Sequence, residues 1–544
     1  MKPLEWSRAK SLFKPEQRHK ILLAGLLLFL GAYRLLLIQS GQLYWPDEFR
    51  YLHALHLLDE LRKGEVAQAL YWVFGAEGGV ASRPSYILFS LAPAALQGVA
   101  NLVFDVQPTD ATFYRIPVVA NVAVSLGLTG TIYYIIWSLS GDRVLALVGA
   151  SVHGLLANTN MYVRHLFPYD TSLLVFLMSL GILLAGQANT GRPLLRAGVA
   201  GLLSGFAATT YPGYYLFILI PLALLLANRP TEWRSVAAFV MAVASVGIIW
   251  EGTARLGGFS FIGASQRFSI ISFTPESSEG VQGAHEEGFL FLPMYLVEIE
   301  GLAGVALGLL FLGFIAMAVR GGFDRRQVMI VAAAVLAYLI YATAVQVFHR
   351  ALFYGRLVHM FIPVMVLAAM LAVTQFRRPS VRYGIVATLM ALSVISFVPN
   401  AITALEVRFP KDLGRELATT LGPGIKICGL GQQPKNTREG SQEACNVFLE
   451  NARHLYPLPD GWKAEPPAGF VLVGEFPHPM QFRPYWFEGY TPSERKRLAA
   501  DPPVISLFTR LRSGRLPWSN GLTTVTDGSD SDARALTARR QGIA

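Results

Sequence analysis

Long apolar runs separated by short polar turns dominate the first 400 residues. Runs near 20 residues recur, which is the length of helix that crosses roughly 30 Å of hydrocarbon. Their apolarity is continuous rather than alternating, which disfavours the strands of a membrane barrel. The pattern predicts an all-α polytopic membrane protein with about eleven spans, at about 20–38, 115–138, 144–163, 171–188, 197–211, 214–228, 235–252, 291–319, 328–348, 356–375 and 383–399.

The charged residues between the runs predict an orientation. Five basic residues precede the first run, and every second turn is short and basic, carrying in chain order Arg143; Arg192 and Arg196; Arg229 and Arg234; Arg320, Arg325 and Arg326; Arg377, Arg378 and Arg382. Because positive residues stay cytoplasmic, we expect a multi-pass protein of the inner (cytoplasmic) membrane with its N-terminus inside. A signal peptide is the alternative for the first run, but many spans follow and no small-residue cleavage site does.

Two segments of the first long outer loop, residues 39–114, are also apolar. The stretch "DEFRYLHALHLLDEL" places Phe49, Leu52, Leu55 and Leu58 on one helical face. The stretch "RPSYILFSLAPAALQGVANLVF" is apolar enough to span, but a span there would reverse every later turn and break the charge pattern. We therefore expect both segments to be helices lying in the membrane interface.

Composition changes near residue 400, where prolines, glycines and charges rise. The stretches "IKICGL", "GFVLVGEF" and "PVISLFTR" are typical of short buried strands, and "PKDLGRELATTL" of an amphipathic helix. We expect a transmembrane domain at 1–400, a small extracytoplasmic α/β domain at 401–518 and a disordered tail at 519–544. The stretch "GLGQQP" lacks the third glycine of a nucleotide-binding loop.

The only cysteines are Cys428 and Cys445, both in the expected outer domain. A disulfide between them suits an oxidising compartment, and two buried free thiols are the alternative. The net charge of +10 is accounted for by membrane orientation, because a nucleic-acid surface would need basic patches interleaved with exposed aromatics.

Acidic and basic residues gather at the outer ends of the expected spans. Asp47 and Glu48 follow the first span, and Asp170 precedes another. Asp47 could simply cap the helix that follows. The basic and imidazole side chains on the same side, several of them embedded in apolar sequence, are Arg50, Arg83, Arg115, Arg164, His165, His285, His349, Arg350 and Arg356. Acids among arginines suit a substrate that carries a phosphate and a hydroxyl to be deprotonated.

Several stretches resemble one family when taken in order. "YRLLLIQSGQLYWPDEFRYLHAL", with its Asp-Glu-x-Arg-Tyr run, resembles the first outer loop of GT-C glycosyltransferases, in the protein-mannosyltransferase and aminoarabinose-transferase-like branch. "SRPSYILFSL" is similar to the family's Lys-Pro segment, with Arg83 where lysine is usual. "YVRHLFPYDTSLLVFLMSL", "GAHEEGFLFLPMYL" and "HRALFYGRLVHMFIPVMVLAA" resemble later outer segments. The resemblance covers about residues 20–400.

The resemblance implies an inverting transfer of a sugar from a polyprenyl-phosphate donor to a glycan, lipid or protein acceptor on the outer face. It implies that Asp47 is the general base and that Glu48 and Asp170 orient the acceptor or bind a divalent cation. The residues expected to bind the donor and its phosphate are Arg50, Tyr51, Arg83, Arg164, Arg350 and Arg356. Asp47, Asp170 and His285 could also hold a divalent cation, although His285 as a polar loop residue is the alternative. For His349 and Arg350 the alternative is interfacial snorkelling.

Three other classes of protein remain open. A transporter would place charges near mid-membrane and contain repeated halves with broken helices. Glu298 and Glu300, inside an expected span, fit that class, but no internal repeat is evident. A polysaccharide polymerase or ligase also acts on lipid-linked glycans, but it would not need the Asp-Glu-x-Arg-Tyr run. A non-catalytic membrane subunit could keep the same fold.

Overall fold

The chain forms two compact units in a computed structural model. The residues described are 15–42, 44–76, 83–106, 111–185, 192–227, 232–272, 287–349, 354–421, 427–428, 447–451, 470–488, 492–500, 502 and 504–510. The first unit contains Met1–Ala401 and also Phe487–Thr491, and the second contains Ile402–Trp486 and Pro492–Ala544. The division at Ala401 lies beside the expected domain boundary. The return of Phe487–Thr491 to the first unit was not expected.

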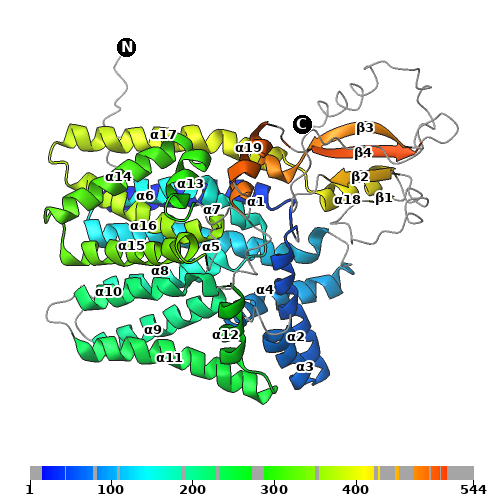
Figure 1. Ribbon diagram of the computed structural model, residues 1–544, viewed down its shortest axis with the longest axis horizontal. Helices are drawn as coiled ribbons and strands as arrows, with labels where there is room; N and C mark the ends of the chain where they lie inside the picture. The colour runs from blue at the N-terminus through cyan, green and yellow to red at the C-terminus, as the bar shows by residue number, and fades with distance from the viewer. Residues whose placement is uncertain are drawn as a thin grey trace, which may run out of the picture. The chain divides into compact units, whose positions relative to one another are not determined.

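The first unit is built of helices, as the apolar runs predicted (Figure 1). Its helices are α1 (Pro15–Leu37), η2 (Pro46–Tyr51), α2 (Leu52–Lys63), α3 (Val66–Leu70), η3 (Tyr71–Gly75), α4 (Pro84–Val103), η5 (Ala111–Tyr114), α5 (Arg115–Ser140), α6 (Arg143–Leu155), α7 (Ala157–Met161), η6 (Tyr162–Arg164), α8 (Tyr169–Ala185), α9 (Pro193–Thr210), η8 (Pro212–Ile218), α10 (Leu219–Ala227), α11 (Trp233–Leu256), α12 (Phe261–Ser272), α13 (Phe291–Ile299), α14 (Gly301–Val319), α15 (Arg325–Gln346), α16 (Gly355–Thr374) and α17 (Pro379–Glu406).

Eight helices of the described part of the chain are long and apolar enough to cross a membrane, and the bent pair of α6 with α7–η6 makes a ninth. The polytopic helical fold is therefore confirmed. Two expected spans form shorter helices, α8 and the segment from η8 to α10. The helix α4, expected in the interface, also has the length and apolarity of a span, so its interfacial placement stays a prediction.

The expected span at 291–319 is broken between α13 and α14. Glu300 lies at the break, fully buried, and its carboxylate accepts the backbone N–H groups of Ala157 and Asn158 at 2.8 and 2.9 Å. These are N–H groups at the start of α7, which a helix leaves without internal partners. A buried acid in an apolar run is thus used here as a helix cap from another element.

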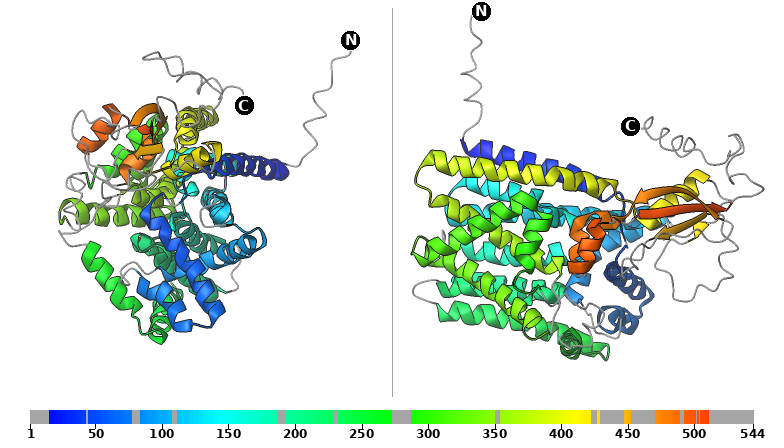
Figure 2. Two further views of the ribbon diagram at one scale, coloured as in Figure 1. Left: turned by 90° about the vertical axis from the view of Figure 1, so that its right-hand side faces the viewer. Right: turned by 45° about the horizontal axis from the view of Figure 1, so that its top comes forward.

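Helix α16 is the most enclosed helix of the first unit. Its 18-residue apolar window is 94% buried, and α5, α6, α14 and α15 pack around it. At one edge of the same unit α1 and α17 lie side by side (Figure 2), with Phe397 contacting the rings of Phe29 and Tyr33. A helix that is apolar on every side is stable in lipid or under a cover of other helices, and α16 is covered by helices. The first two turns of α16, which carry Arg356 and His359, are therefore closely packed.

The second unit contains a four-stranded sheet and short helices. The strand order is β1-β2-β4-β3, with β1 (Ile427–Cys428), β2 (Val447–Asn451), β3 (Phe470–Pro477) and β4 (Val504–Arg510). Only the β1–β2 pair is parallel. Helix α18 (Pro410–Leu421) packs Leu413 against the inward residues of β2 and β4, and α19 (Pro492–Ala500) follows later. The predicted α/β fold is confirmed, although the sequence did not indicate β2.

Candidate functional site

Asp47 lies in a short 3₁₀ turn, η2, which Pro46 opens. Its Oδ1 accepts a hydrogen bond from Arg50 Nη1 at 2.8 Å, and its Oδ2 accepts one from Arg356 Nη1 at 3.0 Å. The 3₁₀ turn places Arg50 over Asp47, because residues three apart eclipse in this geometry. The Asp47 side chain keeps 28% of its surface exposed, so a ligand can reach it.

Arg356 links Asp47 to a second acid. Its Nε donates to Glu488 Oε2 at 2.7 Å, and Glu488 Oε1 accepts from the Tyr162 hydroxyl at 2.6 Å. The Arg356 guanidinium also lies 4.7 Å from the centre of the Tyr354 ring and 5.5 Å from that of Tyr169. Aromatic faces attract guanidinium groups and fix their orientation. The result is a fixed chain of alternating charges from η2 to α16.

Arg83 supplies a third guanidinium near Asp47. It precedes the first turn of α4, is only 7% exposed, and stacks over the Tyr211 ring at 5.2 Å. Its Nη1 is buried and has no hydrogen-bond partner among the described residues. A buried donor without a partner is costly, so this nitrogen is suited to an anionic ligand. Arg83, Arg50 and Arg356 together give Asp47 a strongly positive surrounding.

The charge of Asp47 is set by two opposing effects. Burial disfavours the ionised carboxylate, while Arg356, Arg83 and Arg50 favour it. The guanidinium groups prevail, so the pKa of Asp47 is lowered from its ordinary value. Asp47 is therefore ionised at neutral pH, and it can accept a proton.

Glu48 is adjacent in sequence but differs in its surroundings. It is fully buried, and it accepts from the backbone N–H of Trp45 at 3.0 Å and of Leu166 at 2.9 Å, while His165 Nδ1 lies 3.0 Å away. Its bond to Trp45 closes the capping box of η2. The expected capping role of Asp47 thus belongs to Glu48, which fastens the Asp47 turn to the loop around Leu166.

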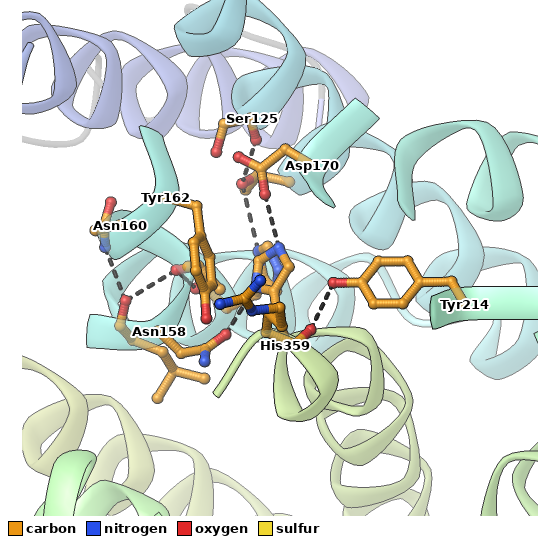
Figure 3. Close-up of polar contacts among 12 residues, drawn as sticks. Ser125, Asn158, Asn160, Tyr162, Asp170, Tyr214 and His359 are labelled. Carbon is orange, nitrogen blue, oxygen red and sulfur yellow. Dashed lines mark hydrogen bonds and ion pairs between the residues drawn. The ribbon is translucent and has the colours of Figure 1, made fainter. Parts of the chain in front are cut away.

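Asp170 lies at the start of α8 and pairs with α16. Its Oδ1 is 2.7 Å from His359 Nε2, and His359 Nδ1 is 2.7 Å from Asn158 Oδ1. Figure 3 shows the Asp170 carboxylate and the His359 ring pointing toward one another, with Asn158 beyond the ring. Because Arg356 and His359 are three residues apart on one helix, Asp47 and Asp170 contact successive turns of the same element. Unlike Asp47, Asp170 is buried.

The remaining expected ligands divide into described and undescribed residues. Tyr51 and Arg164 are both buried, at 3% and 2% exposure, and the Arg164 carbonyl oxygen lies 3.4 Å from Gln42 Nε2. Arg350, His285 and Cys445 lie outside the described residues, as does the Cys428 side chain. The disulfide therefore stays a prediction.

The described residues contain no group of three or more histidine, cysteine, aspartate or glutamate side chains arranged to hold a metal. Both Asp47 oxygens already face guanidinium nitrogens. This donor set fits an anion better than a cation. The proposed cation site with His285 stays a prediction.

Sequence reasoning did not identify Glu488, Tyr162 or His359. His359 had a signal, because it is a titratable residue inside the apolar run of α16. Glu488 had none, since it lies more than 80 residues beyond α17 and only the fold returns it to Arg356.

An apolar cavity of about 250 Å³ adjoins α16 in the first unit. Side chains of α13, α14, α15 and α16 line it, including Leu296, Phe311, Phe361 and Met365. Met365 follows Arg356 by nine residues, which is about 13 Å along a helix axis. The cavity therefore lies farther along α16 than Arg356, toward the C-terminal end of that helix.

Comparison with known proteins gives a likeness among solved structures and none among families or curated proteins. No family model matches the chain, and no curated protein matches it. Among solved structures, the chain is similar to the oligosaccharyltransferase AglB of the archaeon Archaeoglobus fulgidus, in complex with an inhibitory peptide and a dolichol-phosphate. The TM-score is 0.45 and the identity 9%, and the match covers 70% of this chain and 55% of AglB. The chain thus spans little more than half the length of that structure.

Proposed function

We propose that this protein is a membrane glycosyltransferase that moves a sugar from a polyprenyl-phosphate donor to a hydroxyl of a glycan, lipid or protein acceptor on the outer face of the membrane. The observation that carries the proposal is the partly exposed carboxylate of Asp47 between Arg50 and Arg356 with Arg83 nearby. Such a site pairs a proton acceptor with several phosphate ligands, which is the combination that this transfer requires.

The arginines suit the leaving phosphate. Within the described part of the chain, Arg83 has a buried donor without a partner, and Arg356 uses two of its five N–H groups in hydrogen bonds, to Glu488 and Asp47. Guanidinium groups bind phosphate oxygens in a bidentate manner. As the bond between sugar and phosphate breaks, negative charge grows on the phosphate, and these groups stabilise it most in the transition state.

Asp47 serves as the base in this proposal. Its lowered pKa makes it a weak base while Arg50 and Arg356 hold it. A bound phosphate competes for the same guanidinium groups, which raises the pKa of Asp47 and makes it a better proton acceptor once the donor is present. Attack by the acceptor on the face opposite the phosphate inverts the anomeric carbon.

The other predicted acids have different parts in the proposal. Glu48 holds the turn that carries Asp47, and Asp170 holds His359 in the turn after Arg356. The apolar cavity along α16 accommodates a segment of the donor's polyprenyl chain. A divalent cation at Asp47, Asp170 and His285 stays a separate prediction, and no step of this mechanism depends on it.

A transporter is the alternative from another class, and its strongest sequence support was Glu300. That carboxylate is engaged by the backbone of α7, and Glu298 is exposed on α13, so neither needs an ion pathway to account for it. A polymerase or ligase acting on lipid-linked glycans is the other alternative. It shares the lipid phosphate and differs in the glycan transferred.

The test replaces Asp47 by asparagine, which keeps the shape and removes the base. The purified chain in nanodiscs is supplied with a panel of polyprenyl-monophosphate sugars, and release of polyprenyl monophosphate is measured because every such donor yields it. Asp47→Asn should lower turnover roughly 10²–10⁴-fold in a chain that still folds, as its thermal unfolding transition will show. Asp59→Asn is the control, since the described partners of Asp59 are Arg62 and Lys63 on the surface of α2. Equal turnover in both variants would contradict the proposal.

A further inference from the structure

We infer that Glu488, supplied from far beyond the last membrane helix, is a positioning residue that sets the Arg356 guanidinium for the phosphate. The inference rests on the proposed function and assigns a role to a segment that the site would otherwise not need. Among the described residues, Glu488 forms hydrogen bonds with Arg356 and Tyr162 and not with Asp47, so it acts through Arg356.

Two hydrogen bonds hold the Glu488 carboxylate in one position. Its side chain is 4% exposed, and its two oxygens divide their bonds between Arg356 Nε and the Tyr162 hydroxyl. The Nε bond fixes the plane of the guanidinium, because Nε is the nitrogen nearest the flexible stem. The Nη nitrogens are then left for Asp47 and for a ligand.

The neighbouring residue anchors this segment. Phe487 is 1% exposed, and its ring makes edge-on contacts with Tyr295 at 4.9 Å and Phe291 at 5.4 Å between centroids. Tyr295 in turn accepts a hydrogen bond from Asn158, the partner of His359. An apolar anchor followed by an acid explains how a short piece of chain can hold a charge at a defined place in the first unit.

A glycine makes room for the carboxylate. A Cβ atom at Gly355 would come within 2.9 Å of Glu488 Oε1, 3.2 Å of the Tyr295 ring and 3.4 Å of the Tyr162 hydroxyl. Gly355 immediately precedes Arg356, so the backbone of α16 approaches Glu488 as closely as a residue without a side chain permits. The chain thus provides the acid, the anchor and the space that the acid occupies.

The position of Arg356 decides whether phosphate binds well. Arg356 also faces Asp47, which attracts it away from the ligand. Glu488 holds the opposite end of the guanidinium, and the rings of Tyr354 and Tyr169 flank it. Without the bond to Glu488 the long Arg356 side chain gains rotamer freedom, and a misplacement of about 1 Å at such a group can cost on the order of 10²-fold in rate.

The experiment uses the full chain in nanodiscs with four variants. Glu488→Gln removes the charge, Glu488→Asp shortens the reach, and Tyr162→Phe removes only the hydroxyl that supports Glu488. Glu475→Gln is the matched control, because Glu475 is exposed on β3 beyond α17. Binding of decaprenyl monophosphate is measured by native mass spectrometry, and the Arg356 side chain is located by cryo-electron microscopy.

We expect Glu488→Gln and Glu488→Asp to weaken decaprenyl-phosphate binding roughly tenfold or more, Tyr162→Phe to weaken it less, and Glu475→Gln to leave it unchanged. Tighter binding in Glu488→Gln would overturn the inference, since it would make Glu488 a competitor of the phosphate. An Arg356 that keeps its place in Glu488→Gln would overturn it as well. If instead Arg356 moves while the wild-type chain neither binds decaprenyl phosphate nor transfers sugar, positioning stands and the proposed function fails.

Discussion

At the scale of single residues, the carboxyl of Asp47 depends on three guanidinium groups for its charge. Burial alone would raise its pKa, and Arg356, Arg83 and Arg50 reverse that effect. For a carboxyl whose pKa is lowered on folding, the favourable ion pairs exist at pH values above the ordinary pKa, about 3.9, and are lost as the pH falls through the lower folded value. The free enzyme should therefore keep its base ionised well into the acid range.

This dependence gives a prediction for Arg356→Gln. With one guanidinium removed, burial weighs more heavily, so the pKa of Asp47 rises and the acid limb of kcat/KM moves to higher pH. Release of polyprenyl monophosphate across a pH series measures the limb. Arg62→Gln, which disturbs only a surface pair with Asp59, should leave it in place. A limb that moves equally in both variants, or in neither, would remove Asp47 from the role of base.

The pattern of residues in the sequence predicted part of the candidate site. Asp47 and Arg50 are three residues apart in one turn, so local sequence predicts their contact. The different roles of Asp47 and Glu48 could not be predicted from the sequence. They depend on which of the two side chains accepts the backbone N–H of Leu166, 118 residues away. Glu488 was beyond sequence reasoning for the same physical reason, since a contact with Arg356 across 132 residues leaves no local pattern.

At the scale of elements, the apolar runs predicted where helices form better than where they end. Helix α18 has the bounds of the stretch expected to be amphipathic, and α16 begins one residue before its expected start. The apolar run at 291–319 gave no indication that its helix is broken, because the Glu300 carboxylate is stabilised by the N–H groups of α7 rather than by its own helix. Hydropathy reports transfer to lipid and says nothing about such contacts between elements.

The cavity beside α16 gives a prediction at this scale. Gly308 of α14 lines it, and a Cβ atom there would meet nothing within 4 Å, so a leucine side chain has room to begin at this position and to extend into the cavity. If the cavity holds part of the donor's chain, Gly308→Leu should raise KM roughly tenfold for a long polyprenyl donor and leave a short-chain donor little affected, since each buried CH₂ contributes about 0.8 kcal/mol.

A glycine elsewhere in the helices provides the control. Gly247 of α11 is equally open, and it does not line the cavity, so Gly247→Leu should leave KM unchanged for both donors. KM values for donors of two chain lengths, measured on the three proteins, decide the matter. An equal rise in KM for both donor lengths in Gly308→Leu would mean that the polyprenyl chain does not lie in this cavity.

At the scale of the whole molecule, the distribution of charge predicts which side of the membrane each end of the helices faces. Basic residues lie at the starts of α6 and α15, where the side chains of Asp142 and Asp324 cap the helices. Asp47 follows the end of α1, and Arg356 lies at the start of α16, which are the opposite ends of spans. From the excess of lysine and arginine that cytoplasmic turns carry, we predict that the basic turns lie on the inner side of the membrane and that the Asp47 site and residues 401–518 lie outside.

The two cysteines of the chain test this orientation together with the disulfide. In right-side-out membrane vesicles, an impermeant maleimide should add no mass to the wild-type protein until an impermeant reductant opens the Cys428–Cys445 bond, and should then label both residues. Gln375→Cys in a background of Cys428→Ser and Cys445→Ser is the control, because exposed Gln375 lies beside the basic turn after α16 and should react only after lysis. Labelling of the wild-type cysteines only after lysis would reverse the orientation. An outer-face transfer would then be excluded, because the Asp47 end of the helices would face the cytoplasm.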